Sequence, residues 1–221
     1  MDPETVCAAL APLLGDERRG RIDAVIDARL AGLTVVIENL HDPRNGAAVL
    51  RSAEAFGIQA VHVVEAAERF RFSPAVSQGC EKWLDVRRHP TFASAQAALG
   101  GAGFALYAAV PGAAVALEDL DFARPAAVVV GNEHAGLSAA AQQAADVCFS
   151  IPMAGMTRSF NLSVAAAVML ARATERRRQA LGRAGDLDAG ARLRLRARFY
   201  AASVRGARDV VARALAETPG R

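Results

Sequence analysis

Three short polar segments combine asparagine, glutamate, arginine and serine, which are side chains that can bind a polar ligand or act in catalysis. They are Asn39–Asn45, Gly131–Gly136 and Pro152–Ser159. Each follows an apolar run that reads as a strand. Loops that follow the strands of an open parallel sheet meet at its carboxyl edge, where such sheets bind their ligands. The three segments therefore indicate one shared site.

The spacing of residues in these segments excludes several common kinds of site. The first segment is not the glycine fingerprint of a dinucleotide-binding loop, and none has the GxxxxGK[ST] pattern of a phosphate-binding loop. A GxSxG nucleophile motif is also missing. His41, Glu133 and His134 do not have metal-ligand spacing, and the three cysteines are widely scattered. We therefore expect neither a metal site nor a disulfide framework.

Short apolar runs alternate with helical patterns through the middle of the chain. Runs rich in valine, alternating with helices, are typical of a parallel sheet covered by helices on both faces, so we predict an α/β fold. The predicted strands are Thr34–Glu38, Ala60–Val64, Leu84–Arg88, Phe104–Ala109, Ala126–Val130 and Val147–Ile151, and the predicted helices include Ala47–Phe56, Thr91–Leu99 and a stretch near Leu137–Gln143.

Two amphipathic helical segments flank this core, at Asp16–Leu30 and from Gly190 to about Ala216. The net charge is +3, but the last 51 residues carry 13 arginines against five acidic residues, a net charge of +8. Clustered positive charge is expected for a protein that binds nucleic acid, although a solvated arginine-rich helix gives the same pattern. No apolar run is long enough to span a membrane and no signal-peptide pattern is present, so we expect a cytoplasmic protein.

The polar segments resemble the ordered motifs of a known family. The stretches ENLHDPRNGAAVLRSAEAFGIQAV, VVVGNEHAGLS and IPMAGMTRSFNLSVAAAVML are similar in order and spacing to the motifs of the TrmH (SpoU) branch of the SPOUT superfamily. The resemblance implies a parallel α/β core with a deep trefoil knot, which binds S-adenosylmethionine, forms a homodimer and methylates a ribose 2′-hydroxyl of RNA. It also implies an N-terminal helical extension (1–31), a knotted core (32–180) and a basic C-terminal helical extension (181–221).

Within this branch, the chain is most similar to the members that methylate a D-loop guanosine of tRNA, at tRNA position 18. Those members also have a short N-terminal helix and a basic C-terminal extension. Three alternatives stay open: another ribose of tRNA or ribosomal RNA, an RNA-binding knot protein without activity, and, more distantly, a nicotinamide oxidoreductase without its usual glycine fingerprint.

The resemblance also implies active-site residues. Arg51 matches the catalytic arginine, and the other matches are Asn45, Glu133, Ser159 and Asn161. Because a guanidinium stays protonated in proteins, we expect Arg51 to stabilise a developing alkoxide and not to act as the base. Taken without the resemblance, Arg51 reads as a surface arginine, and the other residues read as helix caps.

Cofactor and RNA contacts follow from position in the motifs. The residues expected around the cofactor are Val110, Gly131, Ile151, Met153, Ser159 and Leu162. The arginines expected to contact RNA phosphates are Arg44, Arg158, Arg176, Arg177, Arg178, Arg194 and Arg198. Phe160 stands where the family often has leucine, and we expect it to pack between helices.

Overall fold

The computed structural model describes residues 1–65 and 78–217, and the chain divides into two compact units. The larger unit is Leu30–Arg183, and the smaller combines Met1–Arg29 with Ala184–Arg221. The two ends of the chain, which the sequence predicts as separate extensions, therefore fold together in one unit.

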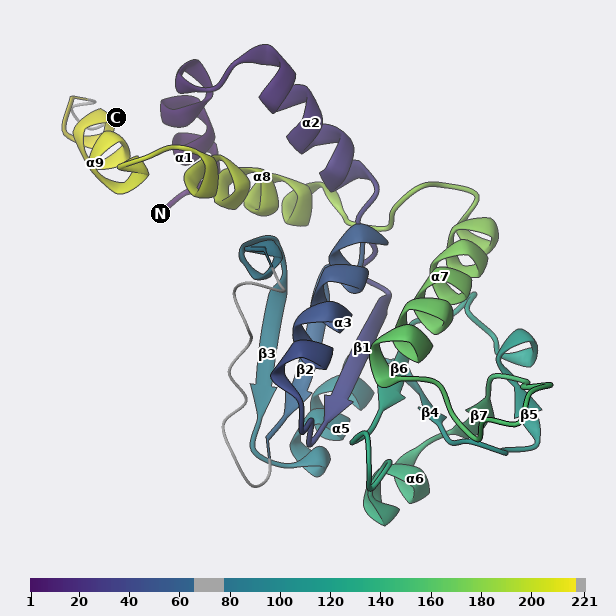
Figure 1. Cartoon of the computed structure of the whole chain (residues 1–221). Coiled ribbons are helices and arrows are strands. Elements are labelled where there is room, and N and C mark those ends of the chain that lie inside the picture. The colour runs from purple at the N-terminus through teal and green to yellow at the C-terminus, as the bar shows by residue number, and fades with distance from the viewer. Residues whose placement is uncertain (66–77, 218–221) are drawn as a thin grey trace. The chain divides into compact units, whose positions relative to one another are not determined.

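The larger unit is built on a parallel sheet of seven strands in the order β3-β2-β1-β6-β4-β7-β5 (Figure 1). All neighbouring strands in this order run parallel, which confirms the predicted α/β fold. The strands are β1 (Leu33–Glu38), β2 (Ala60–Val64), β3 (Asp85–His89), β4 (Ala105–Ala109), β5 (Val115–Ala116), β6 (Ala126–Val130) and β7 (Val147–Ser150).

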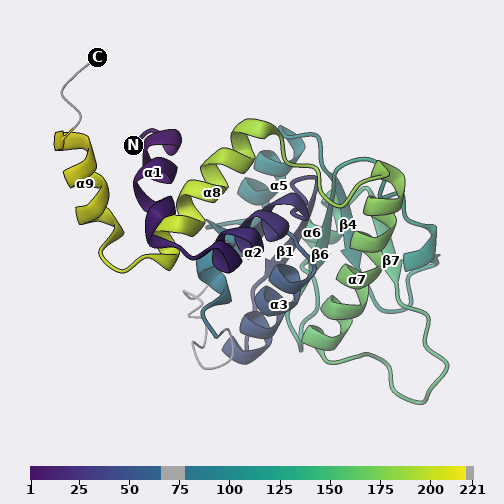
Figure 2. The ribbon, with the colours of Figure 1, turned by 90° about the horizontal axis from the view of Figure 1, so that it is seen from above.

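Helices cover both faces of this sheet (Figures 1 and 2). Successive side chains of a strand point to opposite faces, so Val35 and Val36 of the central strand β1 enter different cores. The core that contains Val35 is closed by helices α3 (Pro43–Ala55) and α7 (Leu162–Leu181), and the core that contains Val36 by α5 (Phe92–Gly100) and α6 (Ala139–Ala144).

The start of α3 differs from the prediction, which places the first helical residue at Ala47. Asp42 caps the helix by accepting a hydrogen bond from the Arg44 N–H at 2.8 Å, and Pro43 occupies the first position. Proline suits that position because its missing N–H would have no partner inside the helix. The helix therefore begins at Pro43, and Asn45 lies within its first turn.

The strand order reverses between β1 and β6, which lie side by side in the sheet. The chain leaves β1 for α3 on one face, and it leaves β6 for α6 on the other face. Loops that diverge in this way open a crevice at the carboxyl ends of the two strands, which is the usual ligand site of open parallel sheets.

The smaller unit consists of helices α1 (Pro3–Leu10), α2 (Asp16–Asp27), α8 (Ala189–Ser203) and α9 (Ala207–Glu217). Helix α1 packs against α8 and α9, and an ion pair of 2.7 Å joins Arg196 of α8 to Asp23 of α2. The single C-terminal helix predicted from the sequence is interrupted between Ser203 and Ala207, where Val204 is extended and Gly206 has a positive φ of 69°. Among the described residues, no helix is both long and apolar enough to cross a membrane.

Three short 3₁₀ helices complete the described elements: Ala11–Leu13, η2 (Cys80–Trp83) and η3 (Leu117–Asp119). None of them is predicted from the sequence, and neither is β5 or a separate helix α1 within the predicted N-terminal extension. Each is a brief element with no long hydrophobic period to reveal it.

A pair of histidines, of which one is buried, joins two strands at one side of the sheet. His62 of β2 is buried, and its Nδ1 lies 2.9 Å from Nε2 of His89 in β3. Burial lowers the pKa of His62 to about 4, and the positive charges of His89 and Arg87 act in the same direction. The pKa of His89 is also lowered, chiefly by burial. The folded protein therefore holds His62 neutral at pH values where the unfolded chain binds a proton.

We predict that this pair makes folding stability depend on pH. In the unfolded chain His62 takes up a proton near its ordinary pKa of 6.5, whereas in the folded protein it does so only near pH 4. The contribution of His62 to folding stability is therefore complete above about pH 6.5 and decreases as the pH falls from about 6.5 to about 4. The free energy of unfolding should decrease by about 2 kcal/mol between about pH 7.5 and about pH 5 through His62 alone. Urea unfolding of the wild type and of His62→Gln at several pH values gives the free energy of unfolding of each protein. The contribution of His62 is the difference between the two proteins in how steeply this free energy changes with pH. Equal slopes would contradict it.

Candidate functional site

A cavity of about 1010 Å³ lies at the carboxyl ends of β1, β4, β6 and β7. Polar residues from the loops after β1 and β6 line one part of it, and apolar residues that follow β4 and β7 line another. The lining segments are His41–Asn45, Ala109–Gly112, Val130–His134, Gly136–Leu137, Phe149–Met153 and Arg158–Leu162, together with Ala165 and Met169 of α7.

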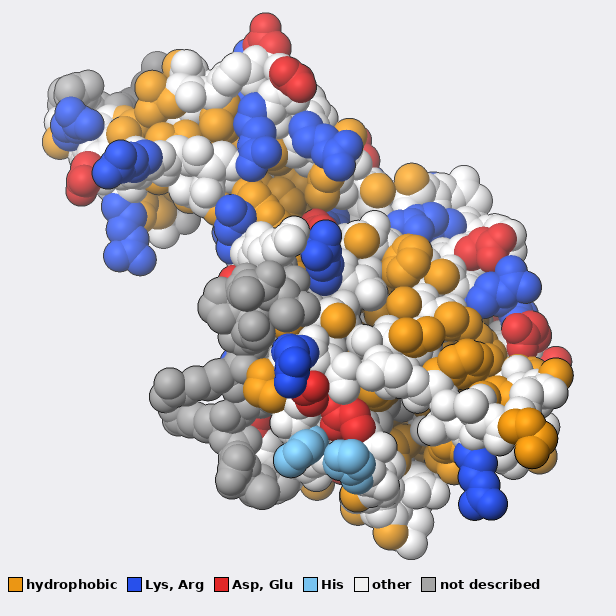
Figure 3. Space-filling model, viewed as in Figure 1, with side chains coloured by type: hydrophobic (Ala, Val, Ile, Leu, Met, Phe, Trp, Pro, Cys, Tyr) orange, Lys and Arg blue, Asp and Glu red, His pale blue; other side chains and the backbone are white. Residues whose placement is uncertain are grey.

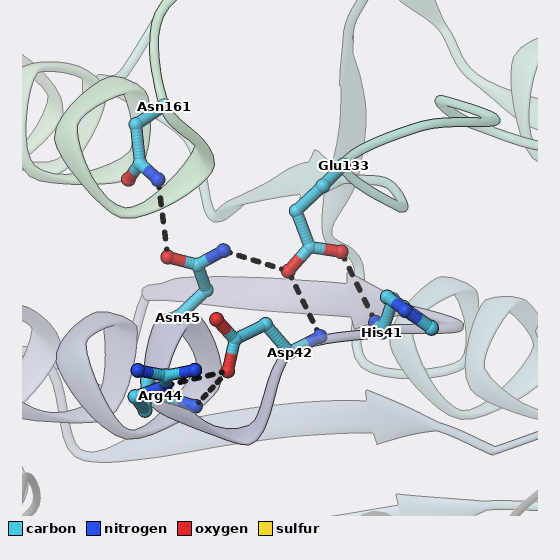
Figure 4. A network of polar contacts seen from close by, with 6 residues as sticks. All are labelled: His41, Asp42, Arg44, Asn45, Glu133 and Asn161. Carbon is cyan, nitrogen blue, oxygen red and sulfur yellow. Dashed lines mark hydrogen bonds and ion pairs between the residues drawn. The ribbon is translucent and has the colours of Figure 1, made fainter.

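The carboxylate of Glu133 joins the loop after β6 to the loop after β1 (Figure 4). One oxygen, Oε2, accepts from the backbone N–H of His41 at 3.0 Å. The other, Oε1, accepts from the backbone N–H of Asp42 at 3.2 Å and from Asn45 Nδ2 at 2.8 Å. A single side chain therefore fixes the positions of two loops that leave the sheet toward opposite faces.

These contacts also determine the ionisation of Glu133. Partial burial favours the neutral acid, but hydrogen bonds from the Asn45 side chain and from backbone N–H groups outweigh it, so the pKa of Glu133 lies below its ordinary value. Glu133 is therefore ionised at neutral pH and holds three donors. It orients the loops and is poorly suited to accept a further proton.

Asn45 and Asn161 extend this network to a third loop. Asn45 lies within the first turn of α3, whose cap is Asp42, so the alternative that Asn45 is only a helix cap does not apply. Its Oδ1 accepts from Asn161 Nδ2 at 3.2 Å. Asn161 does cap α7, accepting from the N–H groups of Ser163 and Val164. Glu133, Asn45 and Asn161 therefore connect three loops in one chain of hydrogen bonds.

Asn132 fixes the turn that carries Glu133. Its side chain donates to the Asn39 carbonyl at 2.7 Å and accepts from the His134 N–H at 2.8 Å. Two backbone hydrogen bonds between Asn132 and Gly136 close the turn. Gly131 packs so closely that an added Cβ would lie 2.4 Å from the Gly136 carbonyl carbon, so only glycine fits there.

Glu38, at the end of β1, provides a second connection between the strands. Its side chain is buried and accepts from the N–H and the hydroxyl of Ser138, at 2.9 Å and 2.7 Å. Ser138 caps α6, which follows β6. Glu38 is not among the site residues predicted from the sequence. The signal that could have identified it as part of the site is an acidic residue at the end of an apolar strand.

Two histidines, His41 and His134, lie at the cavity, and their spacing in the sequence does not predict a metal site. The rings of His41 and His134 meet edge to face, with their centroids 5.5 Å apart and their planes at 66°. Both side chains are exposed, and Figure 3 shows two histidine side chains beside acidic groups on the surface of this face. In the described part of the chain, no group of three or more histidine, cysteine, aspartate or glutamate residues could hold a metal ion.

The structure brings most of the predicted site residues to this one cavity, although their functions stay predictions. The six residues expected around the cofactor all line it: Val110, Gly131, Ile151, Met153, Ser159 and Leu162. The other predicted residues that line it are Asn45, Glu133 and Asn161, with Arg44 and Arg158 from the set expected to contact RNA.

Arg51 is the exception among the predicted catalytic residues. It is exposed on α3 and is not among the residues that line the cavity. Its charge acts instead on Cys80 of η2: burial raises the pKa of Cys80 to about 11, and the Arg51 guanidinium opposes this increase. Within one chain, the predicted catalytic arginine and the cavity are therefore separate.

The arginines near the end of α7 bind backbone carbonyls within the larger unit. Arg177 is buried and donates to the Ala123 carbonyl at 2.6 Å, so it is not accessible to an RNA phosphate, and the prediction for this residue is wrong. Arg176 donates to the Glu118 carbonyl, and Arg178 donates to the Phe56 carbonyl at 2.8 Å. These three side chains attach α7 to neighbouring loops.

Three further predicted positions differ in exposure. In α8 of the smaller unit, Arg194 is exposed, whereas Arg198 is half-buried and lies 5.6 Å from the centre of the Phe199 ring. Phe160 is 43% exposed and lines the cavity, so within one chain it does not pack between helices as expected.

Comparison with known proteins places this arrangement in a family. The model of the SpoU rRNA Methylase family matches residues 32–171. A tRNA (guanosine(18)-2′-O)-methyltransferase from Thermus thermophilus is 39% identical over 166 residues, which cover 75% of this chain and 86% of that protein.

Solved structures agree with this result. The A. aeolicus TrmH/SpoU tRNA modifying enzyme matches 86% of this chain and 98% of its own, with a TM-score of 0.76 and 25% identity. The SpoU methyltransferase AviRb from Streptomyces viridochromogenes, in complex with AdoMet, matches 66% of this chain and 60% of its own, with a TM-score of 0.61 and 28% identity. With the family motifs gathered around one cavity, the chain belongs to the SpoU methylase family.

Proposed function

We propose that this protein transfers a methyl group from S-adenosylmethionine to the 2′-hydroxyl of a guanosine in tRNA, at position 18 of the D-loop. The observation that carries this proposal is the network of Glu133, Asn45 and Asn161, which joins the three family motifs at the cavity. The relative from Thermus thermophilus is named for the same reaction.

The cavity has the properties that S-adenosylmethionine requires. Apolar side chains of Val110, Ile151 and Leu162 can pack against its adenosine, and Gly131 allows close approach because no side chain fits there. When bound, the cofactor would supply an electrophilic methyl group. These contacts, and the trefoil knot that the family resemblance implies, are part of the proposal.

The polar part of the cavity has groups that can hold the RNA. Arg44 and Arg158 are the cationic residues of its lining, and arginine binds phosphate oxygens through paired N–H donors. Asn45 keeps a fixed orientation because both ends of its amide are hydrogen-bonded. In this proposal, the arginines hold the sugar-phosphate backbone, and the asparagines set the direction of the ribose.

We further propose that the protein acts as a cytoplasmic homodimer that uses the start of α7 as its interface. Val164 and Val168 lie one turn apart on α7 and are 49% and 38% exposed, and Phe160, just before the helix, is 43% exposed. The two valines share one face of α7, and Figure 3 shows hydrophobic side chains gathered over this helix. Exposed apolar stripes are common at protein interfaces. In such a dimer, we propose that Arg51 acts at the cavity of the other subunit, because it is exposed and does not line the cavity of its own chain.

The methylation activity can be tested directly. Unmodified total tRNA and ribosomal RNA are incubated separately with the protein and S-adenosylmethionine, and the methylated riboses are mapped by mass spectrometry. We expect one 2′-O-methylguanosine in the D-loop of tRNA. Methylation of ribosomal RNA alone would overturn the choice of substrate. If the protein binds S-adenosylhomocysteine but methylates neither RNA, both the proposed activity and the proposed substrate are contradicted. If it does not bind S-adenosylhomocysteine, an RNA-binding protein without activity is favoured.

The function proposed for Arg51 predicts complementation between subunits. Arg51→Ala and Asn45→Ala homodimers should each be nearly inactive. In a heterodimer purified through two different tags, one cavity has Asn45 from its own chain and Arg51 from its partner. That heterodimer should recover about half of the wild-type rate per dimer. A heterodimer as inactive as its parents would show that Arg51 acts within its own chain or has no catalytic function.

A further inference from the structure

The proposed reaction leaves one proton without an acceptor. A ribose hydroxyl is a weak nucleophile and must lose its proton as the new O–C bond forms. Arg51 cannot accept this proton, because a guanidinium is already protonated at physiological pH. A different group at the cavity must therefore accept it, or the proton must pass directly to water.

Six titratable residues line the cavity in the described part of the chain: His41, Asp42, Arg44, Glu133, His134 and Arg158. The two arginines are excluded because their charge is permanent. Both carboxylates already serve as acceptors for structural donors: Glu133 accepts from three groups, and Asp42 Oδ1 accepts from the Arg44 N–H at 2.8 Å. Only the two imidazoles are left.

Both imidazoles are available for proton transfer. Neither ring has a hydrogen bond to any described residue, and both side chains are exposed on the cavity lining. Histidine is the side chain whose ordinary pKa lies closest to neutral pH, where a general base is most effective. The backbone N–H of His41 is held by Glu133 at 3.0 Å and that of His134 by Asn132 at 2.8 Å, so the two loops place both rings.

Neighbouring charges favour His41 over His134. The Arg44 N–H is the main cause of the lowered pKa of Asp42, and positive charge on His41 contributes. The Asp42 carboxylate therefore places negative charge near the His41 ring. Glu133 adds negative charge on the facing loop, and Arg44 adds positive charge on the same loop. His41 therefore has two carboxylates beside it, that of Asp42 and that of Glu133, which holds its N–H.

Resting on the proposed function, we propose that His41 is the general base that accepts the proton of the ribose 2′-hydroxyl. As the O–CH₃ bond forms, the S–CH₃ bond of the methyl donor breaks, and its electron pair stays on sulfur. The hydroxyl proton moves to a His41 ring nitrogen, so the positive charge of the sulfonium is replaced by that of the imidazolium. Because His41 is exposed, the proton then passes to water. His134 is a positioning residue that packs against the ring.

Single-turnover methylation with saturating cofactor and RNA tests this assignment across a range of pH. In the wild type, the logarithm of the rate should rise with pH and level off near the pKa of the base. His41→Ala should reduce the plateau rate by about a hundredfold or more and remove this rise. His41→Gln, which keeps a polar side chain of similar size, should show the same loss. Added imidazole should partly restore His41→Ala but not His41→Gln, whose side chain fills the space.

Control measurements separate a chemical defect from a structural one. The affinity of His41→Ala for S-adenosylhomocysteine, its KM for RNA and its thermal unfolding midpoint should stay close to the wild-type values. His134→Phe, which retains an aromatic ring, should keep the rise with pH. His89→Gln, which removes a histidine outside the cavity, should retain the wild-type rate at neutral pH.

Two outcomes would overturn the assignment while the proposed function stands. One is a His41→Ala rate within threefold of an active wild type, and the other is a slow variant that retains the wild-type pH profile and does not respond to imidazole. A wild-type protein that transfers no methyl group to RNA would overturn the proposed function itself, and this assignment with it.

Discussion

The carboxylate of Glu133 is the interaction on which the cavity depends. The strand order places β1 and β6 side by side but sends their loops to opposite faces of the sheet. Nothing in that topology fixes the distance between the two loops. Glu133 fixes it by accepting two backbone N–H groups of the β1 loop, and Asn45 passes the constraint to Asn161 and the start of α7. Hydrogen bonds to a charged acceptor are among the stronger ones in proteins, which suits a site built from loops.

The same carboxylate explains why the cavity has separate parts with separate chemistry. Because Glu133 accepts three hydrogen bonds that hold the loops, its charge is committed to structure, and in the proposed mechanism a nearby imidazole accepts the proton. In the proposed function, the apolar residues after β4 and β7 pack against the adenosine of the cofactor, and Arg44 and Arg158 hold phosphate. In the proposed dimer, the second subunit adds what one chain lacks, which is a cation beside the reacting oxygen.

Much of this organisation follows from the sequence, and the exceptions have physical reasons. Valine-rich runs predict the parallel sheet, and the family motifs predict most of the residues that line the cavity. Asn45 and Glu133 could not be distinguished from helix caps, because that depends on whether Asp42 and Ser138 occupy the cap positions. The burial of Arg177 depends on carbonyls more than 50 residues away, which no local pattern reveals. Arg51 has the expected motif position, but it lies beyond the first turn of α3 and is not among the residues that line the cavity.

Amide hydrogen exchange in wild type and Glu133→Gln tests the central claim most directly, because it reports on the two backbone N–H groups that the carboxylate holds. In Glu133→Gln, one acceptor oxygen is replaced by an NH₂ donor of nearly the same shape. Glu118→Gln, on the exposed η3 segment, is the matched control. The account predicts that the amides of His41 and Asp42 exchange at least about tenfold faster in Glu133→Gln than in the wild type or the control. Equal exchange rates in all three proteins would show that Glu133 does not hold the loop, and would contradict the account.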